Sequence, residues 1–246
     1  MQSISPETIF RGFDAWRNAL PQIVKLTKRP LILGRSLNTQ NLRSKLFRDL
    51  ENQKLNVGSA NLQFDCCHED IAQVKEIILN NNHDSVIAAG GGKVLDSGKY
   101  LADCLNIPCI TVPFSASTCA GWTALSNIYS KDGQFLKDVA LRSCPKILVY
   151  DHKFIQTAPS RTLASGIADA LAKWYESSIT SSTIDDGLVQ QAIQISRVLR
   201  DQLLIDGEKA FKYQFENNPS WRNTVEACGL TAGLVGGIGG EKCRTA

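Results

Sequence analysis

Hydrophobic and polar positions follow two alternating patterns over the first two-thirds of the chain. Short apolar runs bounded by turn-forming or polar residues predict buried strands at residues 29–34, 61–66, 85–89, 107–112 and 146–151. Between these runs apolar residues recur at helical spacing, for example at Leu42, Leu46 and Leu50. Strands that alternate with helices predict right-handed crossovers and a mostly parallel sheet covered by helices on both faces.

The pattern changes after Pro113. Two β-like runs flank the stretch Lys131–Gly133, which predicts a hairpin. From Ser160 onward the pattern predicts no strand, and helical spacing covers residues 160–178, 185–207 and 221–237. We therefore expect two domains: an α/β domain over residues 1–158 and an all-helical domain, incomplete, over residues 159–246.

Composition narrows the class of protein. The chain has 246 residues, of which 43% are hydrophobic and 21% charged, and its net charge is +3, values typical of a soluble globular protein. No basic run interleaved with aromatic residues suggests nucleic-acid binding, and no apolar run reaches the roughly 18 residues of a membrane span. The N-terminus has no secretory signal pattern, so we expect a cytoplasmic protein.

Eight cysteines are present and none forms a C-x-x-C pair. The apolar surroundings of Cys104, Cys109 and Cys228 predict small buried side chains in a reducing compartment. A disulfide or zinc framework is the alternative.

The chemistry-bearing stretch of the α/β region is the glycine run Gly90–Gly92, between an apolar strand and a helix. A helix N-terminus offers unpaired N–H groups to a phosphate, and glycine lets the backbone approach a pyrophosphate closely. Asp96, in the first helical turn, is placed to cap N–H groups or to accept from a ribose hydroxyl. Lys93 is placed either to contact phosphate or to remain solvated. The alternative for the whole stretch is a plain strand–helix turn.

Three stretches of the chain resemble the signature motifs of one family. They are GGGKVLDSGKYLAD, TVPFSASTCAGWTALSNIYS and APSRTLASGIADALAKWYE, and they are similar to those of glycerol dehydrogenases in the metal-dependent (iron-containing, group III) alcohol dehydrogenase family. The resemblance extends over residues 29–176 and is weaker beyond them. It implies an N-terminal α/β domain that binds NAD or NADP, a helical domain, and an active site in the cleft between them. It also implies hydride transfer from an alcohol assisted by zinc or iron.

The same resemblance assigns roles residue by residue. It assigns the pyrophosphate and nicotinamide-ribose site to Gly91, Gly92, Lys93, Val94, Leu95 and Asp96. It assigns a second cofactor loop to Phe114, Ser115, Ala116 and Ser117. It completes the cofactor pocket with Thr123, Leu125 and Tyr129.

Asp169 matches the family's metal-binding aspartate and would also contact the substrate. It lies in a stretch of small apolar residues, where a bare carboxylate is very costly to bury. The alternative is an ion pair with Lys173, four residues further along the helix.

Three positions depart from the family pattern. Cys119 stands where glycerol dehydrogenases have a substrate-holding aspartate, and the nearby Trp122 would make the substrate pocket more apolar. Arg35 stands where an aspartate would hold the adenine ribose, which predicts NADP tolerance or preference; ordinary NAD binding beside an exposed arginine is the alternative. The family's two metal-binding histidines are absent, and none of His68, His83 and His152 is favoured as a replacement.

These departures lead to two expectations for this chain. We expect the glycine-rich residues 233–246 to be poorly ordered or detached, because an incomplete domain would leave helix faces without partners. We also expect weak metal binding and turnover near background, because a catalytic metal site uses about three protein ligands.

The function that best fits these observations is an NAD(P)-dependent oxidoreductase acting on the CH–OH group of a small polyol or alcohol, and we expect it to be a homo-oligomer. One alternative is a nucleotide-binding fragment without catalysis. Another is a phosphate-substrate relative, similar to glycerol-1-phosphate dehydrogenase or dehydroquinate synthase, for which Lys173 and Lys242 are the candidate basic residues.

Overall fold

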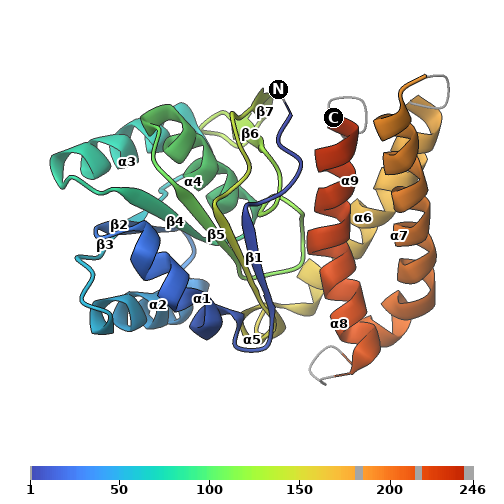
Figure 1. Ribbon diagram of the computed structural model, residues 1–246, viewed down its shortest axis with the longest axis horizontal. Coiled ribbons are helices and arrows are strands. Elements are labelled where there is room, and N and C mark those ends of the chain that lie inside the picture. The colour runs from blue at the N-terminus through green and yellow to red at the C-terminus, as the bar shows by residue number, and fades with distance from the viewer. Residues whose placement is uncertain (1, 181–184, 214–217, 241–246) are drawn as a thin grey trace.

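A computed structural model describes residues 2–180, 185–213 and 218–240 of the chain. Its first part is a six-stranded parallel sheet in the order β1-β8-β5-β4-β2-β3. Figure 1 shows the sheet between two layers of helices, with a bundle of further helices on one side. The strands are β1 (Thr8–Gly12), β2 (Pro30–Gly34), β3 (Gly58–Asn61), β4 (Ser85–Gly90), β5 (Cys109–Pro113) and β8 (Ile147–Asp151).

The two faces of the sheet are buried by different helices. The helices that cover the sheet are α1 (Ala15–Leu26), α2 (Gln40–Asn52), α3 (His68–Asn80) and α4 (Gly92–Leu105). A short 3₁₀ turn at Leu37–Thr39 precedes α2. Successive strand residues point to opposite faces. In β4, Ile87 packs in the cluster that contains residues of α1 and α2, and Val86 packs in the cluster that contains residues of α3 and α4. This confirms the predicted parallel sheet with helices on both sides.

The hairpin predicted around Lys131–Gly133 is also present. Strands β6 (Leu125–Tyr129) and β7 (Phe135–Ala140) pair antiparallel beside the main sheet. Gly133 has a φ of 84°, a conformation that glycine adopts without steric cost.

One predicted strand was misplaced. The strand expected at residues 61–66 is instead β3, Gly58–Asn61, and the residues after it form a loop. The buried carboxylate of Asp70 accepts hydrogen bonds from the N–H groups of Gln63, Phe64 and Asp65. The Asp70 side chain therefore accepts the backbone hydrogen bonds that a neighbouring strand would otherwise accept.

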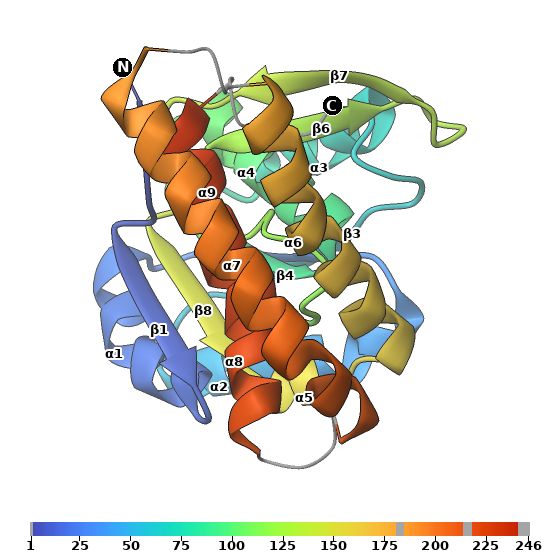
Figure 2. The same ribbon diagram turned by 90° about the vertical axis from the view of Figure 1, so that its right-hand side faces the viewer.

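The second part of the chain is helical. A short helix, α5 (His152–Gln156), leads from β8 to α6 (Ser160–Thr180), α7 (Gly187–Lys212) and α8 (Pro219–Glu226). A π-helical segment, Ala227–Thr231, then runs into α9 (Ala232–Gly239). Figures 1 and 2 show α9 between the sheet domain and α7. No strand follows β8 in the described ranges, as the pattern predicted.

The expectation of a detached C-terminal stretch was wrong for residues 233–240. Gly229, Gly233 and Gly237 follow one another at four-residue intervals, and a Cβ at each would lie within 2.5 Å of Tyr150, Trp122 and Ile4 respectively. The absence of side chains lets this helix lie directly on the α/β domain. Val235, between them, is fully buried. Residues 241–246 lie outside the described part of the chain.

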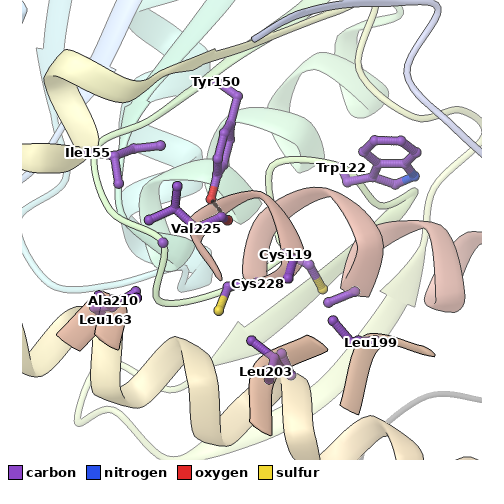
Figure 3. Packing of buried hydrophobic residues seen from close by; sticks show 14 of the residues in the cluster. Cys119, Trp122, Tyr150, Ile155, Leu163, Leu199, Leu203, Ala210, Val225 and Cys228 are labelled. Carbon is purple, nitrogen blue, oxygen red and sulfur yellow. Dashed lines mark hydrogen bonds between the residues drawn. The ribbon is translucent and has the colours of Figure 1, made fainter. Parts of the chain in front are cut away.

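The two parts share one apolar core, drawn in Figure 3. It contains Cys119 and Trp122 from the loop after β5, Tyr150 from β8, Leu199 from α7 and Val225 from α8. The Tyr150 hydroxyl donates to the Val225 carbonyl oxygen at 2.7 Å. Large exposed apolar side chains of the helical part instead lie on α6 and α7, where they include Ile179, Val198, Leu204 and Ile205.

The cysteines of the described residues differ in burial. Cys109 and Cys228 are buried as predicted, whereas Cys104 is exposed on α4, so that prediction was wrong for one of the three. The seven cysteines of the described residues are free thiols.

Among the helices that the structure describes, none has both the length and the apolar character needed to cross a bilayer.

Candidate active site

The three glycines at the junction of β4 and α4 have different surroundings. A Cβ on Gly90 would lie 3.0 Å from the side chain of Val94, and one on Gly92 would lie 3.1 Å from Thr118. These two positions therefore allow close packing of α4 and of the loop after β5. A Cβ on Gly91 would meet nothing within 4 Å. Gly91 is the N-cap of α4, and no side chain caps this helix. The start of α4 thus offers open backbone N–H groups beside free space.

The loop that follows β5 lies next to this helix start. The Phe114 N–H donates to the Gly90 carbonyl oxygen at 3.0 Å, and the Phe114 ring is buried against Phe154. The hydroxyl oxygens of Ser115 and Ser117 lie 2.9 Å apart. Ala116 is buried under α6. The two are in close contact at Gly166, where an added Cβ would lie 1.9 Å from the Ala116 carbonyl oxygen. The glycine in α6 therefore lets the helical part sit directly on this loop.

A cavity of about 490 Å³ lies where these elements meet the helical part. It brings together six of the residues that sequence analysis singled out, from three parts of the chain: Asp96, Cys119, Thr123, Leu125, Asp169 and Lys173. Its remaining walls come from the N-terminal segment, the start of α7 and the end of α9. The end of α9 that was expected to be detached thus forms part of this wall.

Asp96 is a buried carboxylate on the sheet-domain wall of this cavity. The Lys99 ammonium lies 3.0 Å from its Oδ1, and both side chains are nearly inaccessible. Burial raises the pKa of Asp96, and the neighbouring Lys99 opposes that effect. Lys99 also donates to the carbonyl oxygens of Thr123 and Leu125. This lysine therefore ties α4 to the segment that enters β6, and it neutralises the carboxylate.

Lys93 projects from the first turn of α4 and is partly exposed. Its ammonium pairs with the buried carboxylate of Asp65 and lies 4.9 Å from the centre of the Tyr129 ring. Asp65 also accepts from the N–H of Cys66. A fixed carboxylate and an aromatic ring thus hold Lys93 at the start of the helix, and its contact with a phosphate stays a prediction.

Cys119 and Asp169 lie on the other side of the same cavity. Burial raises the pKa of the Cys119 thiol above its ordinary value, so this side chain is neutral near pH 7. Asp169 is half-buried on α6. The Asp169 carboxylate and the Lys173 ammonium, both among the described residues, form no ion pair within 4.0 Å, so the alternative proposed for Asp169 is absent.

The remaining predicted residues lie outside the cavity wall. Arg35 is exposed immediately after the carboxyl end of β2. Val94 and Leu95 are buried in α4. Gly91, Gly92, Lys93, Tyr129 and the loop Phe114–Ser117 surround the helix start without lining the cavity. The helix start and the loop come directly after the carboxyl ends of the adjacent parallel strands β4 and β5. Ligands of open α/β sheets bind at such ends.

The histidines do not contribute to the cavity. His68 begins α3, and His83 Nδ1 lies 3.0 Å from the Arg29 carbonyl oxygen. His152 is buried beside Trp221, with its Nε2 3.2 Å from Glu226. Within residues 2–180, 185–213 and 218–240, no group of three or more His, Cys, Asp or Glu side chains is placed to hold a metal ion. These residues therefore do not form by themselves the metal centre that the resemblance implies.

Sequence analysis missed Asp65 and the role of Lys99. Lys99 lies on the buried face of α4, three residues after Asp96 and one turn after Leu95. A lysine on the apolar face of a helix next to an aspartate is a signal of a buried ion pair. Asp65 carries no comparable signal, because its partner Lys93 is 28 residues away.

Comparisons with known proteins agree with this geometry. Residues 6–152 match the model of the family described as iron-containing alcohol dehydrogenase. The chain is 38% identical over 244 residues to an uncharacterized oxidoreductase of Synechocystis, covering 99% of this chain and 62% of that protein. It is 30% identical over 237 residues to a glycerol dehydrogenase of Escherichia coli, covering 94% of this chain and 65% of that protein.

A solved structure has the same fold. The crystal structure of a probable glycerol dehydrogenase from Sinorhizobium meliloti matches with a TM-score of 0.85 at 26% identity, covering 100% of this chain and 68% of that one. The family match covers more than half of the chain, so this protein belongs to the iron-containing alcohol dehydrogenase family. The chain spans less than two thirds of the length of the two curated relatives.

Proposed function

We propose that the chain belongs to an NAD(P)-dependent oxidoreductase that acts on the CH–OH group of a small polyol or alcohol. The observation that carries this proposal is the cavity that Asp96, Thr123 and Leu125 share with Cys119 and Asp169. It joins α4 and the loop after β5, which follow the carboxyl ends of two parallel strands, to the helical part of the fold. The names of the glycerol dehydrogenase relatives support the same class of reaction.

In this proposal the open N–H groups at the start of α4 bind the pyrophosphate, and Lys93 adds a positive charge. Asp96 accepts from a ribose hydroxyl, and Ser115 and Ser117 contribute hydroxyl groups to the same cofactor. Cys119 and Asp169 face the substrate. Asp169 is one carboxylate ligand for zinc or iron, which would supply Lewis-acid polarisation of the substrate hydroxyl. Because the described residues do not complete a metal site, we derive no catalytic step through the metal.

The test is a calorimetric titration of the chain with NADH and with NADPH. We expect one binding site, and we expect replacement of Lys93 by alanine to weaken binding. Alcohol-dependent reduction of NAD or NADP is then measured with added zinc or iron(II). We expect turnover near background from this chain, because its described residues do not complete a metal site, and chelator-sensitive turnover would show that other residues complete it. Cofactor binding together with bound zinc or iron supports the oxidoreductase, cofactor binding without metal supports a nucleotide-binding module, and no binding of either cofactor contradicts the proposal.

Arg35 gives a prediction about cofactor choice. It is exposed at the carboxyl end of β2, where a guanidinium can pair with the 2′-phosphate of NADP. We expect NADPH to bind at least as tightly as NADH, and we expect Arg35→Asp to shift the ratio of the two dissociation constants toward NADH by about tenfold or more. Arg17→Asp, an equal charge change on the exposed face of α1, should leave the ratio unchanged. Much tighter NADH binding by the unmodified chain would contradict this prediction.

A further inference from the structure

Lys173 is a buried cation in the wall of the same cavity. It lies on α6 one turn after Asp169, and only 6% of the residue is exposed. Within the part of the chain that the structure describes, no hydrogen bond or ion pair joins its ammonium to another residue. The Lys173 side chain lines the cavity, and its ammonium has no acceptor among the described residues, so it is available to an anionic ligand.

The charged groups around Lys173 come from several elements. Cys119, when it is ionised, has the largest effect in raising the pKa of Lys173, and Asp169 and Glu176, which lie on α6 itself, add to it against the effect of burial. Asp96 faces the cavity from α4 but is already paired with Lys99. Asp186, which precedes α7, accepts from the N–H groups of Leu188 and Val189. Among the described residues no carboxylate oxygen lies within 4.0 Å of the Lys173 ammonium, so Asp169 and Glu176 act on it without forming an ion pair.

We propose that Lys173 binds the carboxylate of the substrate, and that the substrate is a small hydroxy acid rather than a neutral polyol. This inference rests on the proposed oxidoreductase function and names its substrate class. In that reaction the carbinol carbon transfers a hydride to NAD(P)⁺ and its hydroxyl loses a proton. The products are an oxo acid and NAD(P)H, and the carboxylate on Lys173 is unchanged.

The surroundings favour a carboxylate over a phosphate. One ammonium balances one negative charge, whereas a phosphate monoester carries up to two and requires more donors. Asp169 and Asp186, carboxylates that also line the cavity, offer no positive charge to the second negative charge of a phosphate and would repel it. Lys242, the other basic candidate named from the sequence, lies outside the described residues.

The test compares three probes with the same three-carbon skeleton: glycerate, glycerol and glycerol 1-phosphate. Their binding to the chain is measured by ligand-observed NMR with a chelator present, so that no metal ion supplies the positive charge. We expect glycerate to bind about tenfold or more tightly than either of the other probes. Lys173→Met should remove the preference for glycerate over glycerol, and Lys173→Arg should retain it. Lys209→Met, which removes an exposed lysine from α7, is the matched control.

Three results would overturn the inference. They are equal affinity for glycerate and glycerol or no binding of either, a preference for glycerate that survives Lys173→Met, and tighter binding of glycerol 1-phosphate than of glycerate. Circular dichroism and thermal unfolding establish that each variant folds, and Lys173→Gln serves as a second neutral variant. Titration with NADH on the same samples tests the proposed function separately. A chain that binds NADH but does not distinguish glycerate from glycerol keeps the function and loses this inference.

Discussion

Replacement of Lys99 by methionine is expected to lower the free energy of unfolding by about 3–5 kcal/mol at pH 7, because it leaves a buried carboxylate without its cation. The Lys99 side chain is 1% exposed, and its ammonium lies 3.0 Å from Asp96. The same substitution removes the hydrogen bonds to the carbonyl oxygens of Thr123 and Leu125. Those carbonyls would each lose a donor in a partly buried setting. Urea unfolding of the two proteins measures the difference.

Two controls separate this effect from a general loss of charge. Lys75→Met removes an exposed lysine from α3 and should change the free energy of unfolding by no more than about 0.5 kcal/mol. Adding Asp96→Asn to Lys99→Met should recover part of the loss, because the uncompensated carboxylate is removed. A Lys99→Met protein within about 1 kcal/mol of the original would show that the pair is not a stabilising feature of the fold.

The loss should also depend on pH. Burial raises the pKa of Asp96 in the folded protein, and removal of Lys99 removes the main opposing effect. A carboxyl group whose folded pKa exceeds its unfolded pKa destabilises the fold when it is ionised. The deficit of the Lys99→Met protein is therefore largest above the raised folded pKa. It should shrink as the pH falls through that value toward the unfolded one.

Replacement of Gly166 by alanine is expected to destabilise the protein by about 1–3 kcal/mol and to weaken dinucleotide binding. The added Cβ would lie 1.9 Å from the Ala116 carbonyl oxygen and 3.1 Å from the Ser117 Cα. These are backbone atoms, which cannot rotate away, so α6 must move off the loop that carries Ser115 and Ser117. The gain in helix propensity, about 1 kcal/mol, offsets only part of this cost.

Gly207→Ala is the matched control for this prediction. Gly207 is buried inside α7, and its Cβ would meet the Ile167 side chain at 3.7 Å, an ordinary contact. This variant should be as stable as the original or more stable, and it should bind NADH unchanged. If Gly166→Ala behaves like Gly207→Ala in thermal unfolding and in NADH titration, the close contact between α6 and the loop is not needed for either property.

The central strands of the fold could be predicted because their apolar runs are continuous. β4 and β5 are buried along their whole length. Because both faces of each strand are covered, its sequence is a nearly continuous apolar run. The edge strand β1 is only partly buried, and it pairs with β8, about 139 residues away in the sequence. Its short sequence has no such run, and no strand was predicted there.

The C-terminal helix shows the opposite limit. Its glycines disfavour an isolated helix, which led to the wrong expectation of a detached segment. The same glycines let it pack on Tyr150, Trp122 and Ile4, contacts that sequence spacing does not reveal. Tertiary packing thus outweighs helix propensity here.

The candidate site could be predicted in part for a related reason. Motifs locate residues that share one segment, such as Gly91, Gly92 and Asp96. The pairing of Lys93 with Asp65 and the shared cavity of Asp96 and Asp169 join distant segments. These relations depend on the topology of the sheet and on how α6 sits on the loop after β5.

The most direct test of the account is hydrogen–deuterium exchange of the chain with and without saturating NADH or NADPH. The account predicts slower exchange at the start of α4, residues 91–95, and in the loop at residues 114–125, because the dinucleotide would contact these backbones. Residues 68–80 of α3, on the surface away from the cavity, should exchange at the same rate in both states. Protection confined to segments other than 91–95 and 114–125, or no protection at saturation, would contradict the proposed cofactor site.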